Sequence, residues 1–171
     1  MNLFEEEIKI RSTWVGALLL ISMLMSYAVA GVSLIADSEN SASIFIVFSV
    51  VMAEGLLLLL FLTAKLKVNV DLIGIGYQWF PFMLKAKRIN WDLVEFAWVR
   101  KSNPLKEFGG WGIKGTKKNR AINVSGNMGL QIIFSDTKRI FIETHNPEQL
   151  KQVLIQLASK GVKGINQQPN E

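Results

Sequence analysis

Two long apolar runs in the first 64 residues restrict what this chain of 171 residues can fold into. Residues 14–36 carry no charged side chain, and residues 44–64 carry one, Glu54. A helix of about 20 apolar residues crosses the hydrocarbon core of a bilayer. Because the short polar connector DSENSAS joins the two runs, we expect an antiparallel transmembrane hairpin with spans over residues 14–36 and 44–64.

Basic residues flank this hairpin on one side only. Lys9 and Arg11 precede the first run, Lys65 and Lys67 follow the second, and the connector contains no Lys or Arg. Loops on the cytoplasmic side of a membrane carry the excess of Lys and Arg. The pattern therefore predicts a multi-pass protein of the cell inner (plasma) membrane with both termini in the cytoplasm.

A cleaved signal peptide is an alternative interpretation of the first run, because the Ala-Val-Ala sequence at residues 28–30 resembles a small-residue cleavage site. Against it, the leader is acidic at residues 5–7 and the apolar run continues past that site. We therefore interpret residues 1–13 as a cytoplasmic N-terminal segment and residues 14–64 as the transmembrane helical hairpin.

Glu54 lies at the middle of the second run. A charged side chain there costs roughly 2.5–3.5 kcal/mol on insertion scales, so Glu54 is expected to be protonated or to have a polar partner. Antiparallel pairing places Ser22, Ser26 and Tyr27 at a similar depth, as candidate hydrogen-bond partners. Two roles for Glu54 stay open: it fastens the hairpin or a homo-oligomer formed through it, or it is part of a proton or ion relay.

After residue 64 the chain changes to short segments in which apolar and polar side chains alternate, as in half-buried β-strands. Turn residues separate these segments, so we expect about seven strands in an antiparallel meander. The predicted strands cover residues 65–72, 74–80, 83–89, 93–101, 120–125, 129–135 and 138–144. The side chains predicted to point inward include Leu66, Val68, Val70, Leu72, Ile75, Tyr77, Trp79, Val94, Phe96, Trp98, Ile122, Val124, Leu130, Ile132 and Phe134.

The period changes again in HNPEQLKQVLIQLASKG, which predicts one amphipathic helix. Asn146 is the expected N-cap, Pro147 the first helical residue, and Gly161 the stop. The cytoplasmic domain is therefore expected over residues 65–160 and a flexible tail over residues 161–171. Because no flexible linker separates the second apolar run from the first strand, the domain is expected to lie against the membrane surface.

The segment FGGWGIKG, residues 108–115, contains the pattern G-x-G-x-x-G, which occurs in dinucleotide-binding folds. A binding fingerprint follows a strand and opens a helix, whereas the flanking residues here are typical of loops and a strand. We therefore expect no cofactor. Trp111 is expected to fold back as a plug, because its glycine neighbours permit a tight bend. A ligand or partner contact is the alternative, since basic residues follow.

Seven short antiparallel strands closed by one C-terminal helix resemble the pleckstrin-homology (PH) architecture. The chain resembles the bacterial PH-like domains of small membrane proteins in the stretches GIGYQWFPF, RINWDLVEFAWVRKSNPLKEFGGWGIKG, INVSGNMGLQIIF and KRIFIETHNPEQLKQVL, within residues 66–158. The resemblance implies a membrane α+β fold, in which a two-helix transmembrane hairpin precedes a PH-like seven-stranded antiparallel β-barrel capped by a C-terminal α-helix. It implies a location more than an activity.

From Lys65 onward the chain has 17 Lys or Arg and 8 Asp or Glu residues, a net charge of +9. Basic side chains beside a bilayer attract anionic headgroups, at about 1 kcal/mol per residue near the surface. The candidates for a lipid or partner contact are Lys65, Lys67, Lys85, Lys87, Arg88, Lys114, Lys117, Lys118, Arg120 and Trp111. A nucleic-acid partner is not expected, because a membrane anchor already accounts for the basic charge.

The chain has no cysteine and one histidine, His145, which excludes thiolate and multi-histidine metal sites. No Ser-His-Asp set or catalytic acid pair is apparent. We therefore expect a non-catalytic integral membrane protein that presents its domain at the cytoplasmic face for binding or scaffolding of a protein partner. The alternatives are an accessory subunit of a membrane transporter or enzyme complex, or an anionic-lipid-binding module.

Overall fold

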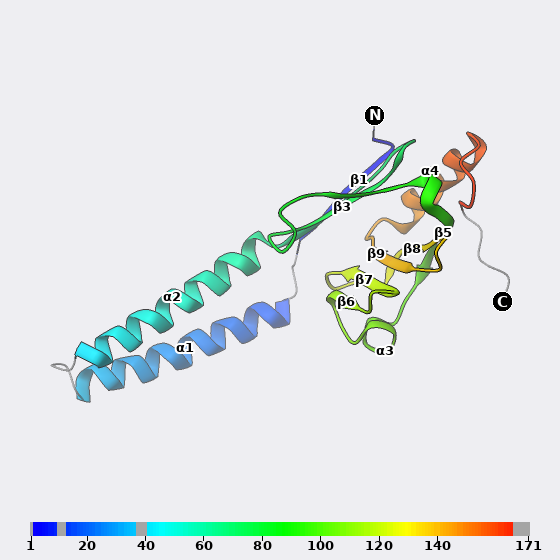
Figure 1. The fold of residues 1–171 in the computed structure, drawn as a ribbon. Coiled ribbons are helices and arrows are strands. Elements are labelled where there is room, and N and C mark those ends of the chain that lie inside the picture. Colours follow the sequence, from blue (N-terminus) through cyan, green and yellow to red (C-terminus); the bar gives the residue numbers. More distant parts are fainter. Residues whose placement is uncertain (1, 10–12, 37–40, 166–171) are drawn as a thin grey trace. The chain divides into compact units, whose positions relative to one another are not determined.

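The structure is a computed structural model that describes residues 2–9, 13–36 and 41–165. The chain forms two compact units, one of Met1–Lys9 with Lys65–Glu171 and one of Ile10–Ala64 (Figure 1). We call the first the sheet domain and the second the helical unit. Most of the predicted connector, residues 37–40, and the end of the predicted tail, residues 166–171, lie outside the described residues.

The helical unit consists of α1 (Thr13–Ala36) and α2 (Ser41–Thr63), which lie side by side (Figure 1). Both are rich in apolar residues and contain no proline that would interrupt the backbone hydrogen bonds. A β-carbon built on Gly16 would lie 3.8 Å from Cε1 of Phe61. The start of α1 therefore meets the end of α2, as in an antiparallel pair.

One helix of the described residues is both long and apolar enough to cross a membrane. Its segment Ile44–Thr63 has 20 residues and a mean hydropathy of 2.7, and none of it is buried within the molecule. In α1 the apolar stretch is the shorter Gly16–Val32. The prediction of a fold with two spans, over residues 14–36 and 44–64, is therefore wrong for the described residues.

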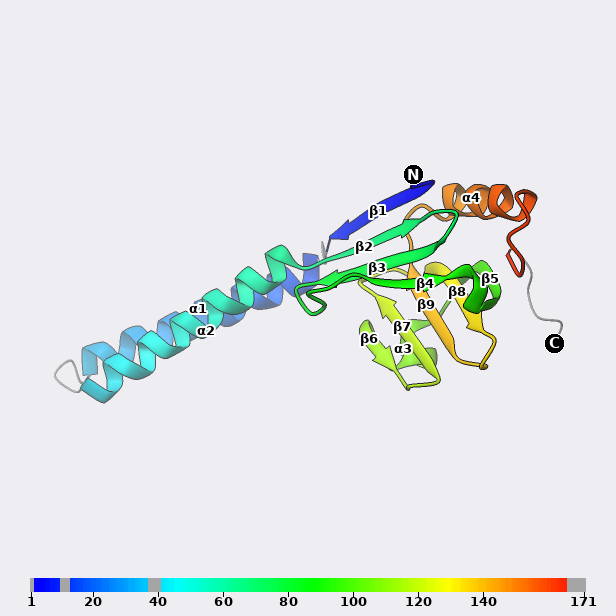
Figure 2. The same ribbon diagram turned by 45° about the horizontal axis from the view of Figure 1, so that its top comes forward.

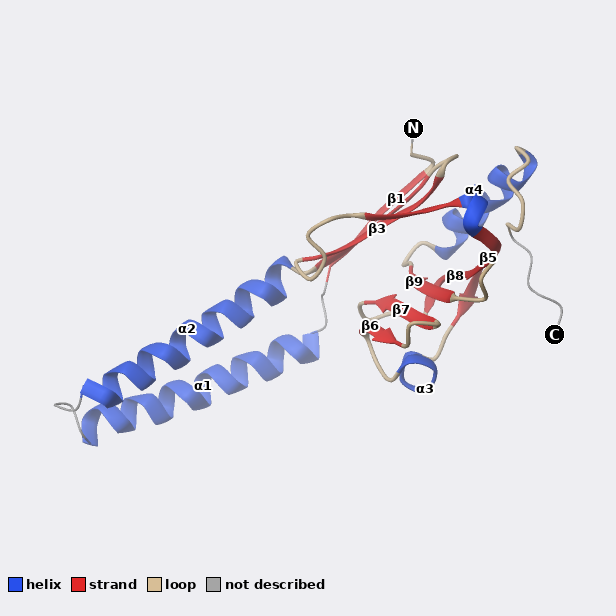
Figure 3. Ribbon diagram, viewed as in Figure 1, coloured by secondary structure: helices blue, strands red, loops and turns tan. Residues whose placement is uncertain are grey.

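Sheet A has four antiparallel strands in the order β1-β2-β3-β4, which are labelled in Figure 2 and drawn in red in Figure 3. The strands are β1 (Phe4–Lys9), β2 (Lys65–Val70), β3 (Gly74–Phe80) and β4 (Lys87–Asn90). Alternation of side chains places one face of the sheet in the core. The buried apolar side chains of this face are Phe4, Ile8, Leu66, Val68, Val70, Ile75, Tyr77, Trp79 and Ile89.

Glu6 joins β1 to the start of α4 (Pro147–Ser159). Its buried carboxylate accepts hydrogen bonds from Thr144 Oγ1 (2.6 Å), the backbone N–H of His145 (3.0 Å) and Asn146 Nδ2 (2.7 Å). The macrodipole of a helix favours a carboxylate near its N-terminus. The N-terminal segment, which the sequence pattern separates from the domain, thus contributes a strand to it.

Sheet B has five strands in the order β5-β8-β9-β7-β6 (Figure 2). The strands are β5 (Val94–Lys101), β6 (Gly112–Gly115), β7 (Asn119–Asn123), β8 (Met128–Phe134) and β9 (Arg139–Glu143). A single 3₁₀ turn, η1 (Trp91–Leu93), leads from sheet A into β5. All neighbouring strands are antiparallel except β7 and β9, which run parallel.

The sheet domain is therefore not the predicted PH-like seven-stranded antiparallel β-barrel. Nine strands of the described residues form two sheets, one of them mixed, and no closed barrel results. The two additional strands are β1 and β6. The parallel pairing breaks the expected meander, because β8 occupies one side of β9 and β7 occupies the other.

Sheet B is covered on both faces. One face carries Leu130, Ile132 and Ile142, whose side chains are almost completely buried. The opposite face carries Phe141, on which Phe108 of α3 (Pro104–Phe108) stacks with 5.7 Å between the ring centroids. The central strands of sheet B therefore contain consecutive buried residues rather than a simple alternation.

A register shift between Val94 and Phe96 changes which side chains of β5 are buried. A β-bulge adds one residue and thereby exchanges the two faces of a strand. Ala97 is completely buried, whereas Phe96 and Trp98 are half-buried, so the prediction that these two aromatic residues point into the core is wrong. Leu72 is also 52% exposed, because it follows the end of β2.

The predicted C-terminal helix is present as α4, which covers the sheet domain near β5 and β1. Its buried side chains are Leu150, Val153, Leu154 and Leu157. Beyond the helix, the backbone N–H of Ala97 donates to the carbonyl of Gly164 (2.8 Å), and Ile165 is 4% exposed. The prediction of a flexible tail is therefore wrong for residues 161–165.

Candidate functional site

The loop between β3 and β4, residues 81–86, presents apolar side chains to the outside. Phe82 is 60% exposed and Leu84 is 80% exposed. The backbone beneath them is held in place: Gln78 Nε2 donates to the carbonyls of Met83 (3.2 Å) and Leu84 (3.0 Å). The Phe82 ring also packs against Trp79, with 4.9 Å between the ring centroids. We call residues 81–86 the β3–β4 loop.

The basic residues around this loop differ in whether a carboxylate neutralises them. Lys65 and Lys67 lie 3.2 Å and 3.5 Å from the Glu7 carboxylate of β1. Lys85 and Lys87 are exposed, and neither makes an ion pair within the described part of the chain. Lys85 and Lys87 are therefore the cations of this region that are available to an external anion.

Arg88, another predicted contact, instead binds Asp71 in the turn between β2 and β3. Asp71 also accepts hydrogen bonds from the backbone N–H groups of Ile73 (2.8 Å) and Gly74 (2.9 Å). Burial acts to raise the pKa of Asp71, but Arg88 and the two N–H groups outweigh it and hold the pKa below its ordinary value. Arg88 is therefore engaged in a structural ion pair.

Trp111 does not plug the domain. It is 39% exposed, and the space against β6 is filled by Trp79 of sheet A, because a β-carbon on Gly112 would lie 3.2 Å from Cη2 of Trp79. Gly110 and Gly112 have φ angles of 124° and 109°, which side chains rarely permit. This backbone conformation leaves the side chain of Trp111 on the outside, so the prediction of a plug is wrong.

The G-x-G-x-x-G pattern does not open a helix. Gly109 caps the C-terminus of α3 in the left-handed conformation, and Gly115 ends β6. A turn follows, in which the backbone N–H of Thr116 donates to the carbonyl of Asn119 (2.8 Å), and the chain continues into β7. The remaining predicted basic contacts lie on this β6–β7 hairpin: Lys114, Lys117 and Lys118 are exposed and Arg120 is half-buried.

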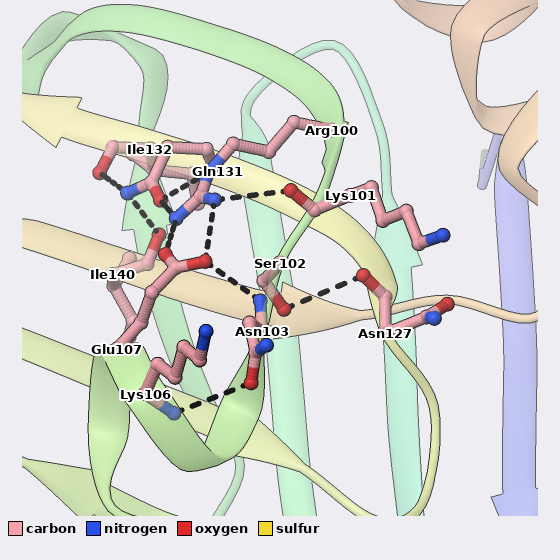
Figure 4. Close-up of polar contacts among 10 residues, drawn as sticks. All are labelled: Arg100, Lys101, Ser102, Asn103, Lys106, Glu107, Asn127, Gln131, Ile132 and Ile140. Atoms are coloured by element: carbon pink, nitrogen blue, oxygen red, sulfur yellow. Dashed lines mark hydrogen bonds and ion pairs between the residues drawn. The ribbon is translucent and has the colours of Figure 1, made fainter.

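A groove of about 670 Å³ lies beside α3, on the face of sheet B that α3 covers. One wall is formed by the end of β5 and the start of α3, and the other by the turn between β7 and β8 (Figure 4). The lining residues are Lys101, Ser102, Asn103, Pro104, Glu107, Trp111, Ser125, Gly126 and Asn127. The groove thus combines polar groups with one exposed aromatic ring.

Arg100 supports the first wall of this groove (Figure 4). Its Nε and Nη2 atoms donate to Gln131 Oε1 (3.0 and 2.9 Å), and Nη2 also donates to Glu107 Oε2 (2.6 Å). The guanidinium lies 5.3 Å from the ring centroid of Phe141. Hydrogen bonding to Arg100 holds the pKa of Glu107 below its ordinary value. Since Arg100 and Glu107 satisfy each other, Lys101 is the cation that the groove presents.

Glu143 supports the second wall. Its completely buried carboxylate accepts hydrogen bonds from the backbone N–H groups of Val124, Ser125 (3.0 Å) and Gly126 (2.7 Å). His145 Nε2 lies 2.8 Å from Glu143 Oε1. Three converging N–H groups form an anion-binding nest, which this side chain fills, so the nest is not open to an external anion.

Glu54 of α2 is not joined to its predicted partners. Its Oε2 atom is buried and has no hydrogen-bond partner within the described residues. The Ser22 hydroxyl donates to the carbonyl of Leu19 (2.9 Å), Ser26 lines an apolar groove of about 340 Å³ between α1 and α2, and Tyr27 is 41% exposed. The hydrogen bonds predicted to fasten the hairpin are therefore not present in this part of the chain.

The sequence analysis identifies the lysines of the β3–β4 loop, but it does not identify the exposed apolar side chains of this loop. The stretch PFML places four consecutive apolar residues before Lys85. This run interrupts the alternation expected of a strand, although the sequence-based prediction starts a strand at residue 83. The break in alternation is the signal that could have identified an exposed apolar loop.

Comparisons of the chain with protein-family models, with curated proteins and with solved structures found no match. The resemblance to bacterial PH-like domains therefore stays a prediction.

Proposed function

We propose that this chain is a non-catalytic membrane-anchored protein that holds its sheet domain at the cytoplasmic face of the inner membrane and binds a protein partner there. The observation that carries this proposal is the pairing of β1 with β2, because it restricts the path of the chain through the helical unit. The register places Lys9 opposite Lys65.

The apolar segment of α2 has the properties of a membrane crossing. It is unburied, with Phe45 71% exposed and Leu62 69% exposed. A continuous apolar surface of this extent is unfavourable in water. At 1.5 Å per residue, 20 residues span about 30 Å, the thickness of a hydrocarbon core. These properties support a membrane crossing by α2.

The chain between β1 and α2 is constrained by the pairing in sheet A. Since Lys9 and Lys65 are adjacent in one sheet, both connections to the helical unit start on the same side of the membrane. A crossing by α2 would put residue 41 on the opposite side and would anchor the sheet domain at the membrane, because Lys65 follows α2 after a single residue.

Charge and exposed side chains support the orientation and the role. Lys65 and Lys67 stand at the sheet end of α2, and the connector between the helices has no Lys or Arg, which favours a cytoplasmic sheet domain. The groove with Trp111 and Lys101 supports a binding role, since exposed aromatic and cationic side chains favour recognition.

The absence of cysteine permits a direct test of topology. Ser38→Cys, in the connector, and Ser125→Cys, in the sheet domain, would each be treated in intact cells with a membrane-impermeant maleimide. We expect Ser38→Cys to react from outside, and Ser125→Cys to react only after the membrane is permeabilised. If Ser38→Cys also reacted only after permeabilisation, or if alkaline carbonate released the chain, the proposal would be wrong.

The binding role has its own test. Proteins would be cross-linked to the full-length chain in intact cells. Trp111→Ser should abolish this cross-linking, because it removes the exposed ring of the groove. Ile155→Ser is a matched control, since Ile155 is 54% exposed on α4. Equal retention of cross-linked proteins by both variants would contradict partner binding at the groove.

A further inference from the structure

We infer that the β3–β4 loop inserts Phe82 and Leu84 into the interfacial region of an anionic bilayer, while Lys85 and Lys87 bind lipid phosphate groups. This inference deepens the proposed function and rests on it, because it requires the sheet domain to be anchored at a membrane. It assigns a lipid-binding surface to the β3–β4 loop and the first residue of β4.

The first support is that the loop is built to hold its apolar tips outward. The Gln78 amide fixes two consecutive carbonyls, those of Met83 and Leu84, and the backbone N–H of Met83 donates to the carbonyl of Trp79 (2.7 Å). The Phe82 ring, which packs on Trp79, still leaves most of its surface exposed. An ordered loop loses little conformational entropy when its side chains enter a lipid phase.

The second support is the position of the loop in sheet A. Phe80, the last residue of β3, pairs with Lys65, the first residue of β2. Lys65 follows α2 after a single residue, Ala64. Neighbouring strands lie about 4.8 Å apart, so the covalent connection alone keeps the start of the loop close to the end of the proposed membrane-crossing helix.

The opposite end of the sheet provides a natural comparison. The turn between β2 and β3 also exposes apolar side chains, with Leu72 at 52% and Ile73 at 66%. It is separated from Lys65 by the length of β2, six residues or about 20 Å. Arg88 pairs with Asp71 of this turn, and Lys160 and Lys163 lie near Leu72 and Ile73. Distance from the end of α2, and not charge, therefore distinguishes this turn from the β3–β4 loop.

The third support is the charge of the loop. Lys85 and Lys87 are exposed and have no carboxylate partner within the described residues, unlike Lys65 and Lys67, which lie near Glu7. Unpaired lysines beside exposed aromatic and aliphatic side chains are the combination that binds membrane interfaces. The connection of Lys65 to α2 favours the bilayer over a protein as the partner of this loop, because the loop starts next to the proposed membrane-crossing helix.

The test uses the full chain in vesicles of phosphatidylcholine with phosphatidylglycerol. Leu84→Cys and Ile73→Cys, each the only cysteine of its chain, would carry an environment-sensitive nitrobenzoxadiazole fluorophore. We expect the Leu84→Cys probe to emit at shorter wavelength and to be quenched by lipids with a doxyl group near the headgroup. The Ile73→Cys probe should show neither effect, because it lies at the opposite end of the sheet.

The results separate this inference from the proposed function. If Ser38→Cys reacts from outside but the Leu84→Cys and Ile73→Cys probes behave alike, the anchor holds and loop insertion is wrong. If the Leu84→Cys probe is shielded from aqueous quenchers but not quenched by doxyl lipid, another copy of the chain covers the loop, which also overturns the inference.

The role of the two lysines is tested with paired substitutions. Lys85→Gln with Lys87→Gln should reduce doxyl quenching of the Leu84→Cys probe several-fold on anionic vesicles and little on pure phosphatidylcholine. Lys117→Gln with Lys118→Gln removes two exposed lysines from the β6–β7 hairpin and serves as the control. Equal loss in both double variants would overturn the assignment of lipid phosphates to Lys85 and Lys87.

Discussion

The Trp79 ring lies so close to Gly112 that a β-carbon there would be 3.2 Å from its Cη2 atom. The same ring contacts Phe82 of the β3–β4 loop, with 4.9 Å between the centroids. One tryptophan of sheet A therefore connects the glycine-rich start of β6 with the loop proposed to bind lipid. The glycine pattern that suggests a nucleotide site in the sequence thus permits a close approach between the two sheets.

Gly112→Ala should destabilise the sheet domain by about 1–3 kcal/mol, the cost of a residue held in a sparsely populated backbone region, and by more where Trp79 must move. The measurement is urea unfolding of the detergent-solubilised full chain, followed by tryptophan fluorescence. Gly110→Ala is the matched control, because Gly110 has a similar φ of 124° but no atom within 4 Å of the position that a β-carbon would take. Equal losses in the two variants would show that the Trp79 contact contributes nothing.

Glu6→Ala should destabilise the chain by roughly 1.5–3 kcal/mol, the range for hydrogen bonds to a charged group. The substitution leaves three donors around the start of α4 without their acceptor. Glu5→Ala, one residue earlier on the exposed side of β1, should change stability by less than about 0.5 kcal/mol. Unfolding midpoints that coincide for these variants would contradict a role for Glu6 in holding β1 to α4.

Asp71 should make the chain sensitive to acid. Its pKa in the folded state is below the ordinary value of 3.8, since Arg88 and two backbone N–H groups outweigh the effect of burial. The contribution of a depressed carboxyl pKa is fully present above the unfolded value and is lost as the pH falls through the folded value. The stability difference between wild type and Asp71→Asn should therefore be largest at neutral pH and shrink below pH 3.8.

The measurement for Asp71 is the urea midpoint of both chains as a function of pH. Asp92→Asn is a suitable control, because Asp92 is exposed and makes no ion pair within the described residues. Its difference from wild type should be small at every pH. A difference for Asp71→Asn that stays constant into acid would contradict the linkage.

Arg100→Lys should cost more than Glu107→Gln. A lysine cannot reproduce the planar fork that serves both Gln131 and Glu107. The buried Gln131 oxygen would then lack donors, at roughly 1–3 kcal/mol. Glu107 is partly exposed, so its neutral replacement should cost at most about 1 kcal/mol. The measurement is urea unfolding of both variants in detergent. A larger loss of unfolding free energy for Glu107→Gln than for Arg100→Lys would contradict this ranking.

Local patterns predict some elements well and fail where distant residues decide. Alternation in β2 and β3 and the helical period of α4 are properties of single segments, and Leu66, Ile75 and Leu154 are buried as expected. In β1 the inward Glu6 hides the alternation, since its partners lie near residue 145. The parallel pairing of β7 with β9 leaves no local signal, because it depends on which strands meet in the folded sheet.

The candidate site shows the same division. Counting charges identifies Lys85 and Arg88 equally, but only the fold shows that Asp71 neutralises Arg88. The bulge in β5 similarly moves Trp98 out of the core, where a strict alternation would place it. Composition therefore indicates a basic surface, whereas the cations available to a ligand depend on contacts between strands.

The register of β1 and β2 pairs Lys9 with Lys65, the last residue before the helical unit and the first residue after it. In topological terms, the entire helical unit occupies the place of the turn in an ordinary β-hairpin. A two-residue Asn-Gly turn suits such hairpins. Joining Lys9 to Lys65 through this turn would preserve every residue pair between β1 and β2. The sheet domain is therefore interrupted by an inserted helical unit, and the two should be separable by this one replacement.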